Sequence, residues 1–170
     1  MSSLDYRYCP SCGREVAVRR IDGMERLACG ECEFVYYNNP RPCVGVIALE
    51  ENRVLLVERG TDPFKGYWDI PGGFMEAGES PETSVIREMQ EETGLEVAPC
   101  ELLGFYTDTY GSERIPTLNI CYIVRVTGGM PNAGSDAVKM EWFALDALPE
   151  KIAFTWERQA LRQLRDRRAG

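Results

Sequence analysis

The chain has 170 residues, a hydrophobic share of 44% and a formal net charge of −8 at pH 7. This length suits one ordinary domain with a small appendage, and the hydrophobic share is enough for a core. The acidic balance argues against a nucleic-acid backbone as the main partner, because proteins that bind one usually present a basic surface. A small phosphorylated substrate stays compatible with it, since bound cations would offset the local negative charge.

No apolar run reaches the roughly 18 residues that a membrane span needs. The first residues also lack the apolar core of a signal peptide, so we expect a soluble, cytoplasmic protein without a membrane partner. The chain contains no histidine, which is the commonest general base. Acid–base chemistry near neutral pH therefore has to use carboxylates or metal-bound water.

Two Cys-x₂-Cys pairs lie near the start of the chain and are separated by sixteen residues: Cys9 with Cys12, and Cys29 with Cys32. Between the pairs, residues 16–21 and 25–28 are predicted to form two short strands around an Asp22-Gly23 turn. This spacing is typical of a four-cysteine zinc site, which would be closed and therefore structural. Two disulfides fit a cytoplasmic chain poorly, and a redox motif would not need two pairs. We predict a zinc ribbon over residues 1–38 and a second domain over residues 39–170.

The connection between the two predicted domains, residues 34–42, is rich in proline and asparagine and is predicted to be extended. Its aromatic side chains, Phe34, Tyr36 and Tyr37, would pack the ribbon onto the next domain or, as the alternative, stack on a base. Residues 43–49 and 54–58 are apolar and β-branched, which is typical of a hairpin.

Further strands are predicted at residues 102–110, 117–126 and 139–143, followed by a helix at residues 155–167. In the second of these strands the apolar side chains alternate onto one face, namely Leu118, Ile120, Tyr122, Val124 and Val126. We expect the three remaining cysteines, Cys43, Cys100 and Cys121, to be small buried residues rather than nucleophiles.

An acidic helix is predicted at the centre of the chain. Ser80 is a suitable N-cap, Pro81 suits the first helical position, and Gly94 ends the helix. The helical period places three carboxylates on one face, and their mutual repulsion would be removed by a divalent cation such as Mg²⁺ or Mn²⁺. These residues are Glu88, Glu91 and Glu92. The alternative for such a face is simple solvation.

The residues around this helix match every fixed position of a known motif, the Nudix box. The pattern is Gly, five residues, Glu, seven residues, then Arg-Glu-apolar-any-Glu-Glu-any-Gly-apolar, and it runs from Gly73 through Glu79 and Arg87 to Leu95. The preceding Gly66-any-Trp68-any-any-Pro71-Gly72-Gly73 is also a usual lead-in. The chain therefore resembles the Nudix hydrolases.

This resemblance implies an α/β/α sandwich with a mixed sheet, preceded here by the zinc ribbon. It also implies that a magnesium site is formed by Glu88, Glu91, Glu92 and the backbone carbonyl of Gly72. In the family, the residues that match Glu79 and Arg87 brace the loop against the helix. A further acid on a later loop often serves as a base or a metal ligand, and the candidates are Asp136, Glu141 and Glu113.

The reaction that the resemblance implies is attack by water on one phosphorus of a nucleoside diphosphate-X compound. Ribbon-containing relatives include NADH diphosphatases and a group that acts on ADP-ribose or FAD. The Ser-Gln-Pro-Trp-type motif of the NADH enzymes is absent between residues 95 and 128, and residues 143–149 with Ala153-Phe154 look more like the second group. We therefore place ADP-ribose or a related dinucleotide first, although the proline that tends to mark ADP-ribose specialists is not evident.

Three alternatives remain open at this point. Tyr110 lies sixteen positions after Gly94, where hydrolases of dinucleoside polyphosphates tend to have a tyrosine, and a nucleoside triphosphate is another possible substrate. The third is a non-catalytic ribbon-type binding module, but a decayed box should have lost a glutamate and none is missing. Family members often form homodimers, which is our expectation for the assembly.

Overall fold

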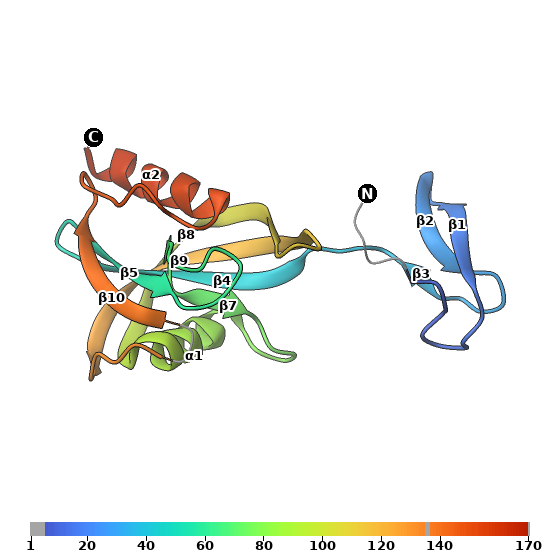
Figure 1. Cartoon of the computed structure of the whole chain (residues 1–170), viewed down its shortest axis with the longest axis horizontal. Coiled ribbons are helices and arrows are strands. Elements are labelled where there is room, and N and C mark those ends of the chain that lie inside the picture. Colours follow the sequence, from blue (N-terminus) through green and yellow to red (C-terminus); the bar gives the residue numbers. More distant parts are fainter. Residues whose placement is uncertain (1–5, 135–136, 170) are drawn as a thin grey trace.

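The computed structural model describes residues 6–134 and 137–169. Its strands form two separate sheets (Figure 1). The N-terminal sheet is antiparallel and has the order β1-β2-β3, with β1 at Val16–Ile21, β2 at Met24–Cys29 and β3 at Val35–Tyr36. Asp22 and Gly23 both have positive φ, 50° and 81°, which is the conformation that a tight two-residue hairpin turn requires. The predicted ribbon hairpin is therefore confirmed.

The second sheet has seven strands, five of them in the order β10-β5-β4-β9-β8, while β6 pairs with β5 and β7 pairs with β4. The bounds are β4 Arg41–Glu50, β5 Arg53–Arg59, β6 Trp68–Asp69, β7 Gly72–Phe74, β8 Leu95–Tyr110, β9 Ile115–Gly129 and β10 Ala137–Ala144. Strands β4 and β9 are parallel and the other pairs are antiparallel, so the sheet is mixed as predicted.

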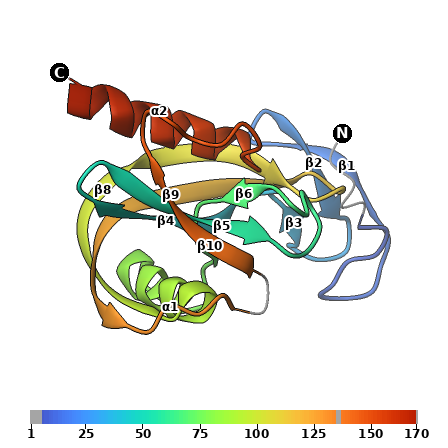
Figure 2. The same ribbon diagram turned by 60° about the vertical axis from the view of Figure 1, so that its left-hand side comes forward.

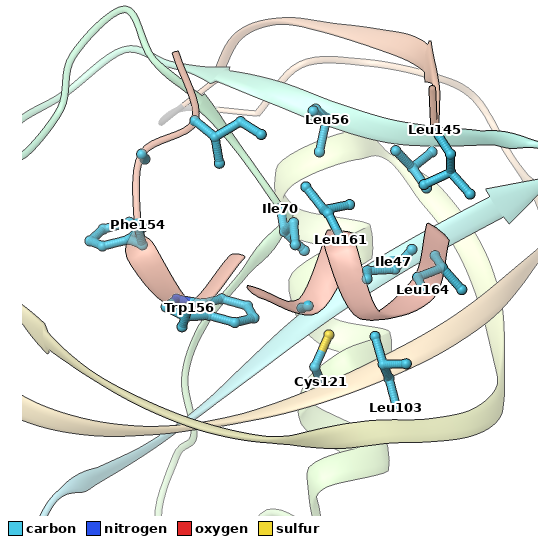
Figure 3. Close-up of a cluster of buried hydrophobic side chains, with 14 residues drawn as sticks. Ile47, Leu56, Ile70, Leu103, Cys121, Leu145, Phe154, Trp156, Leu161 and Leu164 are labelled. Carbon is cyan, nitrogen blue, oxygen red and sulfur yellow. The ribbon is translucent and has the colours of Figure 1, made fainter. Parts of the chain in front are cut away.

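One helix covers each face of this sheet (Figures 1 and 2). Helix α1 spans Pro81–Thr93 and helix α2 spans Thr155–Ala169. Successive side chains of a strand point to opposite faces, and β4 is apolar on both: Val44 and Val46 belong to the core beneath α1, whereas Ile47 belongs to the core beneath α2. Figure 3 shows this second core, in which Leu161 and Leu164 of α2 meet the strands. The predicted α/β/α sandwich is confirmed.

Helix α1 begins and ends where the sequence predicts. The Ser80 hydroxyl accepts a hydrogen bond from the Thr83 backbone N–H, and Gly94 takes the left-handed conformation with φ 68°. The face that α1 turns toward the sheet carries Val85 and Met89, both fully buried. Burial of this apolar stripe fixes the rotation of the helix, and with it the direction of the glutamates on the neighbouring stripe.

Two expectations differ from the structure. Cys100 is exposed and lies in an irregularity of β8, where the register with β9 shifts between Pro99 and Glu101, whereas Cys43 and Cys121 are buried as expected. In β9 the most buried positions include Thr117, Asn119 and Cys121. They alternate with the apolar positions that the sequence favours, because α2 and the residues before it cover that face of the strand as well.

The aromatic residues of the connection pack differently from the prediction. Tyr6 contacts Phe34 and Tyr36, with ring centroids 6.1 and 4.9 Å apart, and the Arg26 guanidinium lies 4.6 Å from the centre of the Tyr37 ring. Among the described residues these contacts lie within the ribbon and not against the larger sheet. A three-stranded sheet this small has little other apolar material for its core.

Candidate active site

A cavity of about 230 Å³ opens between the Gly72-Gly73 turn, α1, the end of β8 and the start of α2. Four carboxylates and one arginine face it, together with aromatic side chains. Its polar and charged lining residues are Arg59, Thr61, Asp69, Glu88, Glu92, Thr109, Tyr110, Thr117 and Glu157.

Glu88 lies beneath the Gly72-Gly73 turn and is buried. A Cβ added to Gly73 would lie 2.7 Å from Glu88 Oε1, which real structures do not allow, so only glycine leaves room for this carboxylate. The Arg87 Nη1 group donates a hydrogen bond of 2.7 Å to the same oxygen. Burial raises the pKa of Glu88 above its ordinary value, although Arg87 opposes the shift.

Glu92 lies one helical turn further along and reaches the backbone of the same turn. Its Oε2 atom accepts a 3.0 Å hydrogen bond from the Gly72 N–H. Burial, followed by the negative charge of Asp69, raises the pKa of Glu92 to about 8. A cation beside this carboxylate would reverse that shift, because it stabilises the charged form.

Arg87 ties the loop before the helix to α1, as the resemblance implies. It donates hydrogen bonds of 2.7 and 2.9 Å to the two oxygens of Glu79 and one of 3.1 Å to the Phe74 carbonyl. The hydrogen bonds from Arg87, followed by one from the Glu76 backbone N–H, lower the pKa of Glu79 to about 2. Two parallel bonds between a guanidinium and a carboxylate fix both position and orientation.

Glu91 differs from the other two helix glutamates because it does not line the cavity. Its side chain is 59% exposed and joins the site through a 3.1 Å ion pair with Arg87. In the described part of the chain, the oxygens of Glu88, Glu91 and Glu92 are not all within 4.8 Å of one another, whereas the four cysteine sulfurs are. The structure therefore brings two of the three predicted ligands into one cavity and leaves the third at its rim.

Two of the three candidate bases, Glu141 and Glu113, lie outside the cavity lining. Glu141 is on β10, where it pairs with Lys139 at 3.6 Å, and Glu113 is in the turn between β8 and β9. Asp136 falls outside the described residues.

Sequence reasoning missed three charged residues that line the cavity. Asp69 forms an ion pair with Arg59. Glu157 is fully buried and accepts 3.3 Å hydrogen bonds from the Ile70 and Phe154 N–H groups. Burial, followed by the charge of Asp69, raises the pKa of Glu157 well above its ordinary value. The sequence offered one signal for these residues: Asp69 is a single acid between the apolar residues Trp68 and Ile70.

Aromatic rings, among them Phe74, Tyr110 and Phe154, also line the cavity. Tyr110 and Phe154 are stacked at 5.9 Å, Phe74 meets Tyr110 edge-on at 5.4 Å, and Phe64 meets Phe154 edge-on at 5.2 Å. The Arg59 guanidinium lies 5.3 Å from the centre of the Phe154 ring. Flat rings beside a cation and carboxylates are suited to a ligand that combines a planar base with phosphate groups.

The four ribbon cysteines converge on a single point. All seven cysteines of the chain are free thiols, and the close pairs are Cys9 with Cys32 at 3.5 Å and Cys12 with Cys29 at 3.6 Å between sulfur atoms. Four thiolates around one tetrahedral zinc ion would be separated by about 3.8 Å, given a Zn–S distance of about 2.3 Å. The donor set and its spacing therefore fit such an ion.

Comparison with known proteins gives the family of the chain. The model described as the NUDIX domain matches residues 39–164. The chain belongs to the Nudix family. A second model, described as Nudix N-terminal, matches residues 7–38 of this Nudix protein. None of its described helices is long and apolar enough to cross a bilayer.

Related proteins carry two kinds of name. An ADP-ribose pyrophosphatase from Methanocaldococcus jannaschii is 42% identical over 126 residues, which are 74% of each chain. An NAD-capped RNA hydrolase NudC from Vibrio atlanticus is 27% identical over 145 residues, and the match spans 85% of this chain but only 51% of that protein. The chain thus spans about half the length of the NudC relatives.

Solved structures show the same fold. A NUDIX hydrolase from Nitrosomonas europaea superposes with a TM-score of 0.79 at 28% identity, covering 96% of this chain and 93% of that one. An ADP-ribose pyrophosphatase from Streptococcus suis superposes with a TM-score of 0.60 at 25% identity over 76% and 93% of the two chains. Together with the family match, these relatives make the protein a pyrophosphohydrolase, an enzyme of a family that normally uses a divalent metal ion.

Proposed function

We propose that this Nudix hydrolase cleaves the diphosphate linkage of ADP-ribose, or of a related dinucleotide such as FAD or NADH, by attack of water on phosphorus. The observation that carries the proposal is the single cavity in which Glu88 and Glu92 face Arg59 and the stacked rings of Tyr110 and Phe154. The name of the M. jannaschii relative supports ADP-ribose as the first choice.

Glu88, Glu91, Glu92 and the Gly72 carbonyl are the proposed ligands of Mg²⁺ or Mn²⁺. Oxygen donors of this kind are what both ions prefer, and the two carboxylates that line the cavity have raised pKa values that a bound cation would lower again. When bound, the metal would offset the phosphate charge and lower the pKa of the attacking water.

The other residues of the cavity have roles that do not involve metal binding. Arg87 holds Glu79 and the Phe74 carbonyl, so it fixes the loop over the start of α1. The rings of Tyr110 and Phe154 offer an apolar surface to the nucleobase. Cleavage would release a nucleoside monophosphate and phosphorylated X. Alanine variants at Asp136, Glu141 and Glu113 would show whether one of these carboxylates assists the attacking water.

The ribbon forms the second part of the proposal. We infer that Cys9, Cys12, Cys29 and Cys32 hold a structural Zn²⁺ ion, which the separation of their sulfurs supports. We also infer that the chain divides into two domains between residues 38 and 39, because β1–β3, which precede this point, form a sheet of their own.

A site of four thiolates needs reduced cysteines, which is typical of the cytoplasm, so we place the protein there. The homodimer is the expected assembly, and analytical ultracentrifugation decides it.

A substrate panel tests the enzymatic proposal. Purified protein is incubated with ADP-ribose, FAD, NADH, diadenosine polyphosphates, nucleoside triphosphates or NAD-capped RNA, each with Mg²⁺ and with Mn²⁺, and the products are separated by chromatography. We expect metal-dependent release of AMP from ADP-ribose with the highest kcat/KM. A preference for diadenosine polyphosphates or triphosphates would replace the proposed substrate. Absence of turnover with every compound would favour the binding module.

The matched variants for this panel are Glu92→Gln and Glu96→Gln. Glu92 faces the cavity, whereas Glu96 is exposed on β8. We expect Glu92→Gln to lower kcat by at least about 100-fold, in line with the loss of a group that stabilises transition-state charge, and Glu96→Gln to retain wild-type activity. Full activity of Glu92→Gln would refute the role assigned to Glu92.

A further inference from the structure

Residues 151–153, which precede α2, form backbone hydrogen bonds to Trp68, on the strand that leads into the Gly72-Gly73 turn. The Trp68 N–H donates to the Lys151 carbonyl at 2.8 Å, and the Ala153 N–H donates to the Trp68 carbonyl at 2.8 Å. Trp68 and Ile152 thereby form a parallel bridge. The next N–H of this strand edge belongs to Ile70, and the neighbouring chain leaves the bridge after Ile152 and enters α2 at Thr155.

Glu157 supplies the acceptor that the backbone no longer provides. Its Oε1 atom accepts the Ile70 N–H at 3.3 Å, so a side chain continues the ladder by one position. Without this contact the buried N–H of Ile70 would lose its hydrogen-bond acceptor, which is unfavourable.

Helix capping alone does not account for Glu157. Its second oxygen accepts the Phe154 N–H at 3.3 Å, as an acid at the third position of a helix often does. However, Asp108 of β8 already accepts the Trp156 N–H at 3.1 Å and caps the same end. A fully buried acid is an expensive way to cap a helix, and Glu157 also contacts the 69–72 segment, at the Ile70 N–H and at the Asp69 side chain.

The segment held by Glu157 carries groups of the proposed active site. The Pro71 carbonyl accepts the Val46 N–H at 2.8 Å, and the Gly72 N–H donates to Glu92. On the other side of Ile70, Asp69 pairs with Arg59. A shift of Ile70 would therefore move the Gly72 carbonyl and the Asp69–Arg59 pair together.

We propose that Glu157 is a positioning residue that aligns the residue 69–72 segment with the N-terminus of α2, and thereby sets the metal affinity of the site. The proposal rests on the metal-binding role of Gly72 and Glu92 proposed above. Glu157 itself binds no metal in this scheme. It acts through the backbone of Ile70, and the stacked Phe154 ring on its other side moves with it.

The test compares Glu157→Ala with Gln163→Ala. Gln163 is also on α2 and also makes two hydrogen bonds, to the Leu103 carbonyl and the Tyr106 hydroxyl, but neither partner belongs to the 69–72 segment. Binding of Mn²⁺ is measured by calorimetry without substrate, and kcat is measured on the best compound of the panel. Circular dichroism and thermal unfolding report whether each variant is folded.

We expect Glu157→Ala to weaken Mn²⁺ binding at least fivefold and to lower kcat at least tenfold, while Gln163→Ala stays within twofold of wild type in both. Glu157→Gln, whose amide oxygen still accepts one N–H group, should recover part of the loss. Equal Mn²⁺ affinity of Glu157→Ala and Gln163→Ala would overturn the proposal. If the alanine variant does not fold, Glu157→Asp decides in the same way, because the shorter acid does not span both backbone groups.

The calorimetric arm separates this proposal from the proposed function. If wild type binds Mn²⁺ but turns over no compound of the panel, the substrate assignment fails while the effect of Glu157 on metal affinity is still measured. If wild type hydrolyses ADP-ribose and Glu157→Ala binds Mn²⁺ as tightly as wild type, only the positioning role is refuted.

Discussion

The carboxylate of Glu88 lies so close to Gly73 that a Cβ at position 73 would be 2.7 Å from Glu88 Oε1. We expect Gly73→Ala to displace this carboxylate from the cavity and to lower kcat at least tenfold, because small misplacements of a reacting group are costly. Steady-state kinetics check this outcome. Gly128→Ala is the control, since a Cβ there meets the side chain of Glu96 at 3.0 Å, and Glu96 is exposed and free to move, whereas Glu88 is buried. Equal activity of the two variants would contradict the assignment.

A second close approach joins strand β4 to helix α2. A Cβ on Gly45 of β4 would lie 2.2 Å from the Trp156 ring. Overpacking of this kind costs about 1–3 kcal/mol, so Gly45→Ala should lower the free energy of unfolding by that amount in a urea titration. The additional exchange Trp156→Leu should recover part of the loss, and strictly additive effects would show that the two residues do not interact.

The Glu79–Arg87 pair predicts how stability depends on pH. The pKa of Glu79 is lowered from 4.5 to about 2 in the folded protein. A group with a lowered folded pKa stabilises the fold above its unfolded pKa, and this contribution is lost as the pH falls through the folded value. The free energy of unfolding should therefore fall more steeply between pH 4.5 and 2 in wild type than in Glu79→Gln. Parallel curves for the two proteins would mean that the pair adds no stability.

Removal of metal should unfold the ribbon alone. The four cysteine sulfurs converge, and a three-stranded sheet of this size has little apolar core, so a bound ion would supply most of its folding energy. We expect about one zinc ion per chain by elemental analysis of protein purified with a reducing agent. Chelation should increase hydrogen exchange in residues 6–36 and leave exchange in β4 and α1 unchanged. Protein that is folded in this region without zinc would refute the site.

Much of the fold follows from local sequence patterns. The cap at Ser80, the stop at Gly94 and the hairpin turn at Asp22-Gly23 all lie where single residues favour a particular backbone conformation. The helical period likewise determines that Glu88 and Glu92 share a face. These features depend on neighbours within a few residues, so the chain specifies them without knowledge of its tertiary contacts.

Other features depend on which distant segments meet. Glu91 has the spacing of a ligand but lies at the rim, since the rotation of α1 is set by the burial of Val85 and Met89. Glu157 and Ile70 are 87 positions apart, and nothing in either stretch indicates that one needs the other. The sequence by itself determined the family pattern, the cysteine cluster and the acidic helix, because spacing along the chain encodes them. Only the tertiary structure decided which charges enter the cavity, because burial and hydrogen bonding there arise from the packing of α2 against the sheet.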